Sequence, residues 1–511
     1  MKRHGIKSVT GLACLCASVW WWTQAARPRM RAPQETPVAF WAWRDAVPSA
    51  QSWAAASQTT GARVLFARAG QWDWRGGRWQ RIRAAQGKWP PVNELHLVYN
   101  ATRDGLAQLE TADATAWARE IAAVFAADKA RAEQDSAKVA GLQLDIDAPT
   151  RLLPHYAKLL RAVRGAIEPA AKLSVTGLPT WMDSAMLPQV LAVVDFWTPQ
   201  CYGGRIPQRV DDAQPIASPD ETARSVARAH ATGKPFYAGL AAYGYALLYD
   251  AGGRLGEMRG DLNPARFAAD ERLELTQKQP FTNRDGAASG AWRYVWRARE
   301  AGVLDSLAWR KGETIIFDAP SVESLRQTAR AARASGGPAM LGLCVFRLPE
   351  TDDGANLSAP QIAEALADKP SVPSSADILT NLTPAHHAPN ENTRAWHLAV
   401  TNNTTADAQL GDGALVLTLF APPGRARVSA WDGFQQVVYL CGETPENAAP
   451  CSERRANFIR LTARAWPAGQ SLSAEIMGAT APERLYMAAQ WQTGGQWQEQ
   501  RTLTLEGAKT P

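Results

Sequence analysis

Eight short apolar runs alternate with helical patterns between residues 38 and 349, and this alternation constrains the fold more than any other feature. Most of the runs are nearly continuous in apolar residues, which is typical of strands buried on both faces. The runs are "VAFWAW" (38–43), "ARVLFARA" (62–69), "ELHLVYN" (94–100), "GLQLDID" (141–147), "KLSVTGLP" (172–179), "VDFWTPQCY" (194–202), "PFYAGLAAYGY" (235–245) and "AMLGLCVFRLP" (339–349). Helical patterns such as "LLPHYAKLLRAVRGAI" lie between several of them. Strands that alternate with helices in this way predict a (β/α)8 barrel.

The barrel strands do not account for the whole chain. Residues 27–367 are expected to form the barrel, and about 251–311 form an insertion between its seventh and eighth strands. Residues 368–394 are rich in Pro, Ser and Asn and predict a linker. Short alternating runs separated by turn residues then occupy 395–511 and predict a small all-β sandwich. The predicted fold is therefore α/β: a (β/α)8 TIM barrel with one insertion, followed by a β-sandwich domain.

The N-terminal segment combines the basic residues Lys2, Arg3 and Lys7 with an apolar stretch over 9–22. That stretch is shorter than the roughly 20 residues that span a bilayer, and it fits the hydrophobic region of a signal peptide. Residues 1–26 are therefore expected to be a signal peptide, with an uncleaved membrane anchor as the alternative. The expected location is periplasmic or secreted, or at the inner membrane if the segment is retained.

Export permits disulfide formation among the six cysteines of the chain. Cys441 and Cys451 flank the turn-forming stretch "GETPENAAP" and are the expected pair. Cys201 and Cys344 lie inside apolar strand-like runs, where free, buried thiols are expected.

The composition argues against several other classes of function. The net charge of +6 is small for 511 residues, and no dense basic run predicts a nucleic-acid partner. Only seven His are present, with no HExxH motif and no paired-cysteine spacing, so no metal is expected. His96, with Glu94 on the same strand face, is interpreted as a barrel-interior group. No phosphate-binding loop or dinucleotide fingerprint occurs in a supporting context, and no cofactor is expected.

Asp145 and Asp147 end the fourth apolar run. The two-residue period of a strand points both side chains to the same side, and active sites of such barrels lie at the C-terminal ends of the strands. Paired acids suit glycoside hydrolysis, in which one carboxyl protonates the leaving oxygen and another group stabilises the developing positive charge. The two aspartates are therefore the candidate catalytic residues. The alternative is a structural pair held by backbone amides or by a neighbouring cation such as Arg44, Arg68 or Arg347.

Over most of 37–353 the sequence resembles the chitinase-like family 18 glycoside hydrolases. "QLDIDAP" resembles that family's strand-four signature, in which aspartates precede a catalytic glutamate by four and two residues. "FWTPQCYG" resembles its strand-six motif, with Tyr202 at the tyrosine, and "YAGLAAYGY" resembles its strand-seven segment, with Tyr243 matching. "GLCVFRLPETDD" places Phe346 where a sugar-stacking tryptophan usually lies. The set also resembles an uncharacterised bacterial family, a domain of unknown function in the same glycosidase-like superfamily.

The sequence departs from that family at three signature positions. Pro149 stands at the catalytic glutamate, Leu142 at the first aspartate and Gly203 at the strand-six aspartate. Proline cannot donate a proton, so the family's substrate-assisted mechanism does not carry over as it stands. In an enzyme, the proton donor is then Asp147 or one of the acids near the predicted rim, which are Asp183, Glu350 and Asp352. The alternative is a barrel that binds sugar without cleaving it.

Aromatic and polar residues near the predicted strand ends favour a carbohydrate ligand. The chain has 21 Trp, and flat aromatic rings stack on the apolar faces of sugar rings. Neutral amides at the strand ends suit hydrogen bonds to hydroxyl groups. The candidate substrate-binding residues are Trp41, Trp43, Asn100, Trp181, Gln200, Tyr202, Tyr243, Phe346, Arg347 and Glu350.

These observations lead to an exported glycoside-hydrolase-like barrel that acts on or binds an envelope or extracellular polysaccharide. Two alternatives stay open: a non-catalytic carbohydrate-binding barrel, and a scaffold protein in which the sandwich does the binding. Carbohydrate is the expected partner and nucleic acid is not. Membrane attachment through residues 1–26 belongs to the anchor alternative.

Overall fold

The computed structural model describes residues 35–203, 206–212, 214–283, 285–351, 353–368, 378–385, 394–420, 423, 426–478, 484–493 and 496–506. The expected signal peptide and the rim acid Asp352 lie outside this set. Across the described ranges, no helix combines the length and the apolar character that a membrane crossing requires. The chain divides into two compact units, described one at a time below: 1–204 with 217–240 and 327–348, and 205–216 with 241–326 and 349–511.

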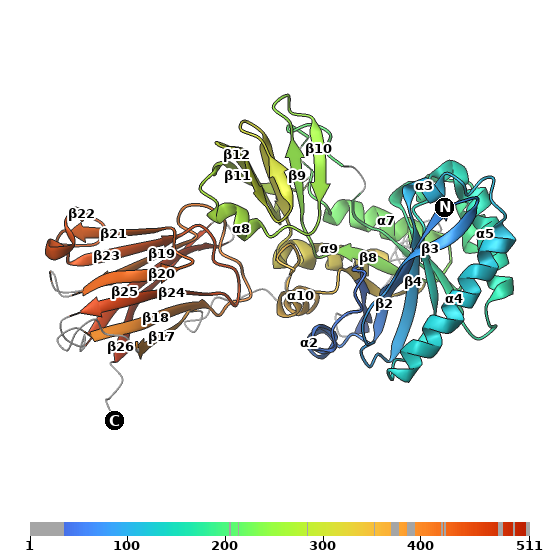
Figure 1. The fold of residues 1–511 in the computed structure, drawn as a ribbon, viewed down its shortest axis with the longest axis horizontal. Helices are drawn as coiled ribbons and strands as arrows, with labels where there is room; N and C mark the ends of the chain where they lie inside the picture. Colours follow the sequence, from blue (N-terminus) through green and yellow to red (C-terminus); the bar gives the residue numbers. More distant parts are fainter. Residues whose placement is uncertain are drawn as a thin grey trace, which may run out of the picture. The chain divides into compact units, whose positions relative to one another are not determined.

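The first unit is a closed barrel of eight parallel strands (Figure 1). Their order around the barrel is β1–β2–β4–β5–β6–β7–β8–β16, and β16 pairs with β1 to close the ring. Val38 is in register with Leu343 on one side of β1, and Ala39 with Val64 on the other. The strands are β1 (Val38–Ala42), β2 (Val64–Arg75), β4 (Glu94–Ala101), β5 (Val139–Asp145), β6 (Lys172–Gly177), β7 (Phe196–Pro199), β8 (Phe236–Ala241) and β16 (Met340–Phe346). Each falls within or overlaps one of the eight apolar runs, so the predicted barrel is confirmed.

Alternate residues of these strands fill the inside of the barrel. The buried interior cluster consists of Ala39, Trp41, Val64, Phe66, Val98, Phe196, Tyr237 and Cys344. Because side chains alternate along a strand, the residue two positions after each of these also points into the barrel. It lies closer to the C-terminal mouth. Arg68, two residues after Phe66, is one such residue.

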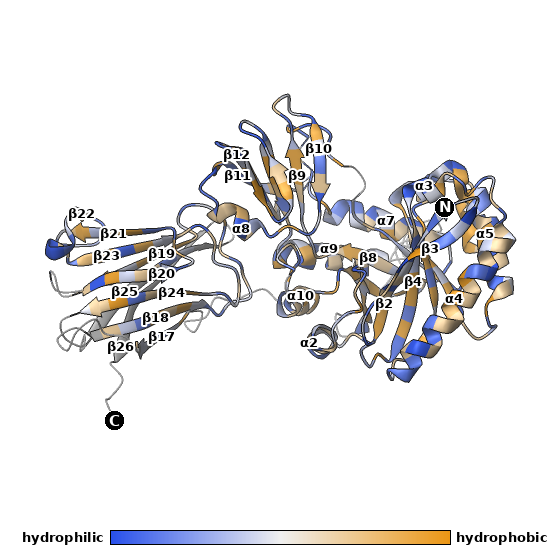
Figure 2. Cartoon of the chain, viewed as in Figure 1, coloured by the Kyte–Doolittle hydropathy of each residue, from blue (hydrophilic) through white to orange (hydrophobic). Residues whose placement is uncertain are grey.

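Helices cover the outside of the barrel. The buried residues of α5 recur at helical spacing, as in Tyr156, Leu160 and Val163, and the opposite face is polar. Figure 2 shows the mixed apolar and polar colouring of α4 and α5 that results. The helices of the first unit are α2 (Ala50–Thr60), α3 (Arg103–Leu106), α4 (Ala114–Gln134), α5 (Leu153–Ala166), α6 (Leu187–Leu191), α7 (Pro219–Ala231) and most of α9 (Val322–Ser335), with 3₁₀ turns η2 (Thr150–Leu152) and η3 (Pro179–Asp183).

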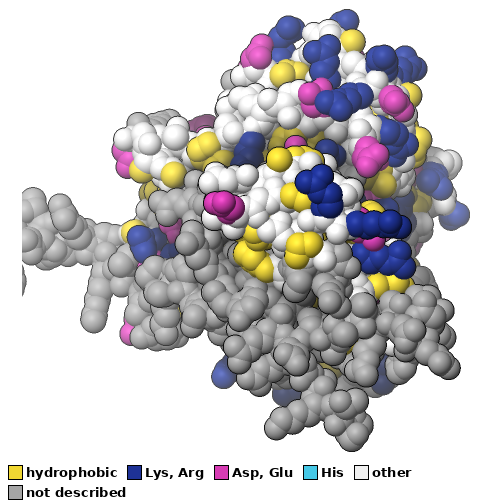
Figure 3. Space-filling view, turned by 90° about the vertical axis from the view of Figure 1, so that its left-hand side faces the viewer, with side chains coloured by type: hydrophobic (Ala, Val, Ile, Leu, Met, Phe, Trp, Pro, Cys, Tyr) yellow, Lys and Arg dark blue, Asp and Glu magenta, His cyan; other side chains and the backbone are white. Residues whose placement is uncertain are grey.

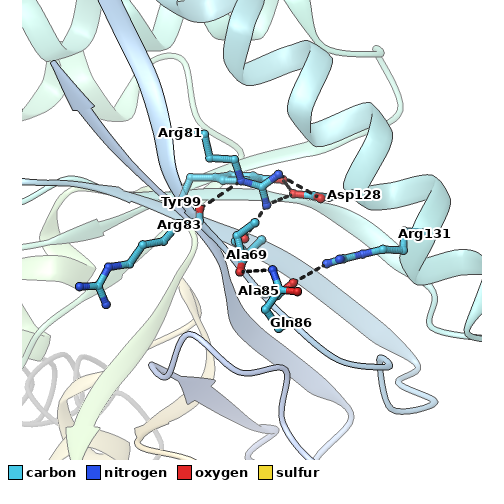
Figure 4. A network of polar contacts seen from close by, with 9 residues as sticks. Ala69, Arg81, Arg83, Ala85, Gln86, Tyr99, Asp128 and Arg131 are labelled. Atoms are coloured by element: carbon cyan, nitrogen blue, oxygen red, sulfur yellow. Dashed lines mark hydrogen bonds and ion pairs between the residues drawn. The ribbon is translucent and has the colours of Figure 1, made fainter. Parts of the chain in front are cut away.

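A hairpin extends one wall of the barrel beyond its mouth. β2 continues past its barrel segment and returns as β3 (Arg78–Ala84) through Gly76 and Gly77, which both have positive φ as a two-residue hairpin turn requires. Arg81 anchors β3 to α4: its Nη2 lies 2.6 Å from Asp128 Oδ2, which also accepts a hydrogen bond from the Tyr99 hydroxyl at 3.0 Å (Figure 4). The network fixes the hairpin to the helix behind it.

The insertion is a β-sheet lobe in the second unit. Its five strands have the order β10–β9–β15–β12–β11 and pair antiparallel. Arg293 and Asp318 form a buried bidentate ion pair across β12 and β15, with both N–O distances at 2.7 Å. The elements are β9 (Tyr245–Tyr249), β10 (Leu255–Arg259), α8 (Pro264–Ala269), β11 (Leu273–Thr282), β12 (Ala288–Ala298), β13 (Gly302–Leu304), β14 (Leu307–Trp309) and β15 (Thr314–Ala319), and α10 (Ala359–Leu366) follows the last barrel strand.

The C-terminal part of the second unit has two antiparallel sheets, as predicted for a sandwich. The four-stranded sheet has the order β17–β18–β24–β20 and the six-stranded sheet β22–β21–β23–β19–β25–β26. Residues of both sheets, such as Leu398 and Leu417, share one buried cluster. The strands are β17 (Ile378–Pro384), β18 (Arg394–Asn402), β19 (Leu415–Phe420), β20 (Ala426–Asp432), β21 (Gln436–Cys441), β22 (Ala449–Pro450), β23 (Phe458–Ala463), β24 (Ser471–Gly478), β25 (Arg484–Thr493) and β26 (Gln496–Glu506), with the turn η4 (Glu453–Arg455).

Two details of this part bear on the expectations above. β17 lies inside the range 368–394, which was expected as a linker, and pairs with β18 along its whole length. Cys441 and Cys451 are joined by a disulfide, with their Cα atoms 5.8 Å apart.

The charged surface is mixed. On the face seen in Figure 3, Lys and Arg side chains lie among Asp and Glu side chains and small apolar patches. This distribution agrees with the small net charge of +6.

Candidate functional site

The candidate site lies at the C-terminal mouth of the barrel, where β5 ends. Asp145 is the last residue of β5 and is in register with Asn100 of β4; Asp147 follows two residues later. Gln143, two residues before Asp145, lies inside the barrel and accepts a hydrogen bond from Trp41 Nε1 at 2.9 Å. Alternation along the strand directs Asp145 to the interior as well.

Asp145 has two neighbours that stabilise its negative charge. Thr176 of β6 donates a hydrogen bond to its Oδ1. Arg68 of β2 is a cation close enough to act on the same carboxyl. Burial has the largest effect and raises the pKa of Asp145, whereas the hydrogen bond from Thr176 and the charge of Arg68 lower that pKa. Asp145 is thus a buried acid whose ionised form is partly supported.

Asp147 lacks that support. No residue in the described part of the chain donates a hydrogen bond to it, and its side chain is exposed at the mouth. The surrounding protein and then the charge of Asp145 raise the pKa of Asp147 to about 7. Because water also reaches this carboxyl, solvent weakens the effect of burial, but the charge of Asp145 acts in the same direction.

The two carboxyls have unequal surroundings. Two neighbouring carboxylates do not both ionise readily. The hydrogen bond from Thr176 and the charge of Arg68 favour the ionised form of Asp145, whereas burial and the charge of Asp145 favour the protonated form of Asp147. The arrangement therefore favours the proton on Asp147.

An aromatic wall forms another part of the mouth. The Phe346 ring, at the end of β16, lies 5.5 Å from the Trp41 ring and is stacked at 6.0 Å on the Tyr202 ring, with 24° between the planes. Trp41 and Tyr202 are mostly buried, and Phe346 is the most accessible of the three. A sugar ring with one apolar face could rest on Phe346 while its hydroxyl groups meet the polar residues of β2, β4 and β5.

Trp43 and two arginines occupy the adjoining sector. The Arg347 guanidinium lies over the Trp43 ring, 4.7 Å from its centroid, and Arg347 is almost fully buried. Arg68 Nη1 donates a hydrogen bond to the Trp43 carbonyl oxygen at 3.3 Å. Arg347 thus packs against the Trp43 ring and is enclosed by the protein.

Three enclosed polar atoms lie on neighbouring strands of this sector: Trp43 Nε1, Arg68 Nε and Asn100 Oδ1. None has a hydrogen-bond partner among the residues that the structure describes. Buried polar groups in folded proteins are nearly always hydrogen-bonded, so each of these atoms has hydrogen-bonding capacity that water or a polar ligand can use.

Two predicted contact residues have different surroundings. Trp181, in η3, is fully buried; its Nε1 donates to the Ala148 carbonyl oxygen at 2.8 Å, so it is a core residue with no ring face for a sugar. Gln200 follows β7, and its backbone N–H donates to the Gly177 carbonyl oxygen at 2.8 Å, which fixes it at the mouth end of β7.

The structure gives the remaining candidates neighbours of their own. Tyr243 and Glu350 belong to the second unit, where Tyr243 forms an isolated antiparallel bridge with Asn356. Asp183 is exposed on the first unit and forms an ion pair with Arg228 at 2.9 Å. Pro149 precedes η2 and presents no ionisable group near the acid pair.

Sequence reasoning missed Thr176 and Gln143, two polar residues inside the barrel beside or below the acid pair. Gln143 donates from Nε2 to Ser174 and Thr198, at 3.4 and 3.2 Å, across β6 and β7. The detectable signal was the period-two series Gln143, Asp145 and Asp147 on one strand face. Its partners on β6 follow only when the register between the strands is known.

Fold and site together define a (β/α)8 barrel with paired acids and an aromatic wall at its C-terminal mouth. Residues 101–275 match a family model described as "Domain of unknown function (DUF3142)". This confirms the resemblance to a family of unknown function that the sequence indicated. A comparison with curated proteins found no match.

Several solved structures are similar to the chain. The spore cortex-lytic enzyme SleL of Bacillus cereus is 12% identical, covers 65% of this chain and 74% of its own, and has a TM-score of 0.41. A chitinase from Chromobacterium violaceum is 15% identical, with 65% and 98% coverage and a TM-score of 0.41. A chitinase-like agglutinin from Robinia pseudoacacia is 12% identical, with 65% and 99% coverage and a TM-score of 0.38.

Proposed function

We propose that this protein is an exported glycoside hydrolase that acts on an envelope or extracellular polysaccharide through Asp145 and Asp147. The observation that carries the proposal is the unequal environment of the two carboxyls. Asp145 has a hydrogen-bond donor and a cation beside it, whereas the pKa of Asp147 is raised to about 7. Paired acids with different protonation states are what hydrolysis of a glycosidic bond requires.

The chemistry follows from these protonation states. Asp147 donates its proton to the glycosidic oxygen as the bond from that oxygen to the anomeric carbon breaks. Asp145, as an anion, stabilises the positive charge that develops on the sugar. Water adds its hydroxyl group to the anomeric carbon, and its proton restores Asp147. The aromatic wall around Phe346 supports the sugar ring during these steps.

A second candidate function is carbohydrate binding without cleavage. The specific observation in its favour is Pro149, which stands where the resembled family has its catalytic glutamate. In that case the mouth, with its enclosed polar atoms and aromatic wall, binds a glycan and Asp147 serves as a hydrogen-bonding group.

Incubation of the full chain with a panel of polysaccharides, with measurement of released reducing ends, separates the two functions. In an enzyme, Asp147→Asn lowers release by on the order of 10²–10⁴-fold, the contribution of a general acid, while binding changes little. Glu168→Gln is the matched control, because Glu168 is an exposed acid of the first unit paired with Lys129 and is not a candidate proton donor. Normal release by Asp147→Asn contradicts the proposed mechanism. Saturable binding with no release by the wild type supports the second candidate.

Export is part of the proposal and is supported by the sequence of residues 1–26. Fractionation of the producing cells, with identification of the N-terminal peptide by mass spectrometry, tests it. A mature N-terminus near residue 27 in the periplasm or medium indicates a cleaved signal peptide, and an intact N-terminus in the membrane fraction indicates an anchor. Recovery in the cytoplasm contradicts export.

A further inference from the structure

A series of alternating charges connects the acid pair with the outside of the barrel. Arg83 of β3 forms an ion pair with Asp45, and Asp45 Oδ1 lies 3.3 Å from Arg68 Nη1. Arg68 in turn acts on the charge of Asp145. The series therefore runs from a cation on the hairpin, through an anion and a second cation, to the buried candidate acid.

The exposure of these side chains decreases toward the interior. Arg83, Asp45 and Arg68 are 56%, 40% and 14% exposed, respectively. Figure 4 shows the Arg83 side chain extending away from the Arg81–Asp128 pair. Arg81 thus fastens the hairpin to α4, and Arg83, two residues further on, carries the outermost charge of the series.

Packing alone does not explain Arg68. Burial lowers the pKa of its guanidinium, and the charge of Asp45 only partly offsets that effect. Its Nε has no hydrogen-bond partner in the described parts of the chain. Enclosing a cation with incomplete hydrogen bonding is unfavourable, and an apolar residue would fill the same barrel position at a lower cost.

Two side chains lower the pKa of the Asp145 carboxyl, and two others, Asp147 and Tyr156, have their own pKa raised by its charge. Thr176 from β6 donates a hydrogen bond to it. Tyr156 from α5 donates from its hydroxyl to the Leu144 carbonyl oxygen at 3.2 Å, and its pKa is raised by burial and by both acids. Arg68 from β2 is the one cation among the described groups that act on Asp145.

We propose that Arg68 is a positioning residue for the acid pair: it keeps the negative charge on Asp145 and the proton on Asp147, and Asp45 and Arg83 set how strongly it does so. The role in catalysis rests on the proposed function. The distribution of charge does not, because it can be measured without a substrate.

Substituting different members of the series is expected to shift the pKa of Asp145 in opposite directions. Removing Arg68 takes a cation from Asp145, so the pKa of Asp145 rises. Removing the charge of Asp45 leaves Arg68 unneutralised and takes an anion away, so the pKa of Asp145 falls. Removing Arg83 leaves Asp45 to neutralise Arg68 more fully, so the pKa of Asp145 rises, but by less than when Arg68 is removed.

The experiment is infrared difference spectroscopy of the full chain in the Asp147→Asn background, where Asp145 titrates without its partner. The protonated carboxyl band of Asp145 is identified by subtracting the spectrum of a variant that also carries Asp145→Asn. We expect Arg68→Gln to move the midpoint of this band up by about one pH unit or more, the usual effect of an adjacent opposite charge. Arg68→Lys restores most of the wild-type midpoint, because it keeps the charge.

The two outer residues provide the test of sign. Asp45→Asn moves the midpoint down and Arg83→Gln moves it up by less than Arg68→Gln. Arg75→Gln is the matched control, because Arg75 is on the same hairpin, is 58% exposed and pairs with a different acid, Asp73. If Arg68→Gln does not fold, the opposite shifts of the Asp145 midpoint in Asp45→Asn and Arg83→Gln still test the role of Arg68.

Each result identifies which proposal fails. An unchanged midpoint in Arg68→Gln, or shifts of the same sign in Asp45→Asn and Arg83→Gln, overturns the role of Arg68, whether or not the protein is an enzyme. The expected shifts in a protein that releases no reducing ends leave the role of Arg68 in place and overturn the proposed hydrolysis.

Discussion

The two ends of the barrel hold acidic residues under opposite conditions. At the N-terminal end, Glu94 lies 3.1 Å from His96 Nε2 and accepts a hydrogen bond from Lys172 Nζ at 2.8 Å. The hydrogen bond with His96, helped by that from Lys172, lowers the pKa of Glu94 to about 2 against the effect of burial. At the mouth, burial and the charge of Asp145 raise the pKa of Asp147 to about 7.

The contrast does not come from the strands, since β4 reaches both ends. β4 begins at Glu94, whose carboxylate has hydrogen-bond partners. Near the other end of β4, the enclosed Asn100 Oδ1 has no hydrogen-bond partner in the described structure. At the N-terminal end, His96 lies between the rings of Phe66 and Phe196, at 4.9 and 5.2 Å. One end thus holds an acid paired with His96 and Lys172 beneath packed rings, as expected for the face of such barrels that contributes stability.

The largest expected effect compares two phenylalanines. Phe66→Ala, at the packed end, is expected to lower the free energy of unfolding by about 3–5 kcal/mol, because it leaves a cavity in a fully buried ring cluster. Phe346→Ala, at the partly exposed mouth, should cost clearly less and should weaken glycan binding instead. Denaturant unfolding of both variants measures the difference. An equal loss of stability would remove the distinction between the two ends.

The second expected effect concerns Glu94. The folded pKa of about 2 lies below the usual value of 4.5 for such a carboxyl, so this carboxylate stabilises the fold above pH 4.5 and loses that contribution as the pH falls through 2. Glu94→Gln should cost roughly 2 kcal/mol at pH 7, as for a hydrogen bond with a charged group, and progressively less between pH 4.5 and 2. Thermal unfolding across this range, with the exposed Glu110→Gln as control, measures it. A deficit that does not depend on pH would contradict the assigned charge.

The smallest effect has the opposite sign and concerns Asp147. Its folded pKa of about 7 lies above the usual value of 3.8 for an aspartate, so ionisation in the folded state is unfavourable and the fold loses stability as the pH rises from 3.8 through 7. Asp147→Asn should therefore be more stable than the wild type at pH 8 and no different at pH 3. Asp183→Asn, at an exposed and paired acid, should show no such gain. A loss of stability in Asp147→Asn at pH 8 would show that this acid is a structural group.

Most of the architecture could be predicted from the sequence, but only part of the candidate site. The barrel strands were predictable because burial on both faces leaves continuous apolar runs, and Asp145 and Asp147 were predictable because a strand has a period of two. The inserted sheet extends from Tyr245 to Ala319, beyond the expected 251–311, because β9 and β15 are apolar like the barrel strands.

The pairings across strands were not predictable. Thr176 meets Asp145 only through the register of β6, and no local pattern encodes that register. Trp181 follows a strand end in sequence, as a rim residue does, but a 3₁₀ turn directs its ring into the core. Arg68 could be named as a neighbouring cation, whereas its link to Asp45 and Arg83 depends on a hairpin that was not foreseen.

The seam between β1 and β16 determines when the barrel can form during synthesis. The strands that meet there, with Val38 opposite Leu343, are about 300 residues apart in the chain. Contacts between residues so far apart in sequence form slowly. On that side β1 has no partner strand until residues 340–346 have been synthesised. Until then β1 and β8 keep open edges, so a chain truncated before residue 340 should aggregate. The same delay suits the proposed export, because a chain whose barrel has not closed is still unfolded enough to pass through a membrane channel.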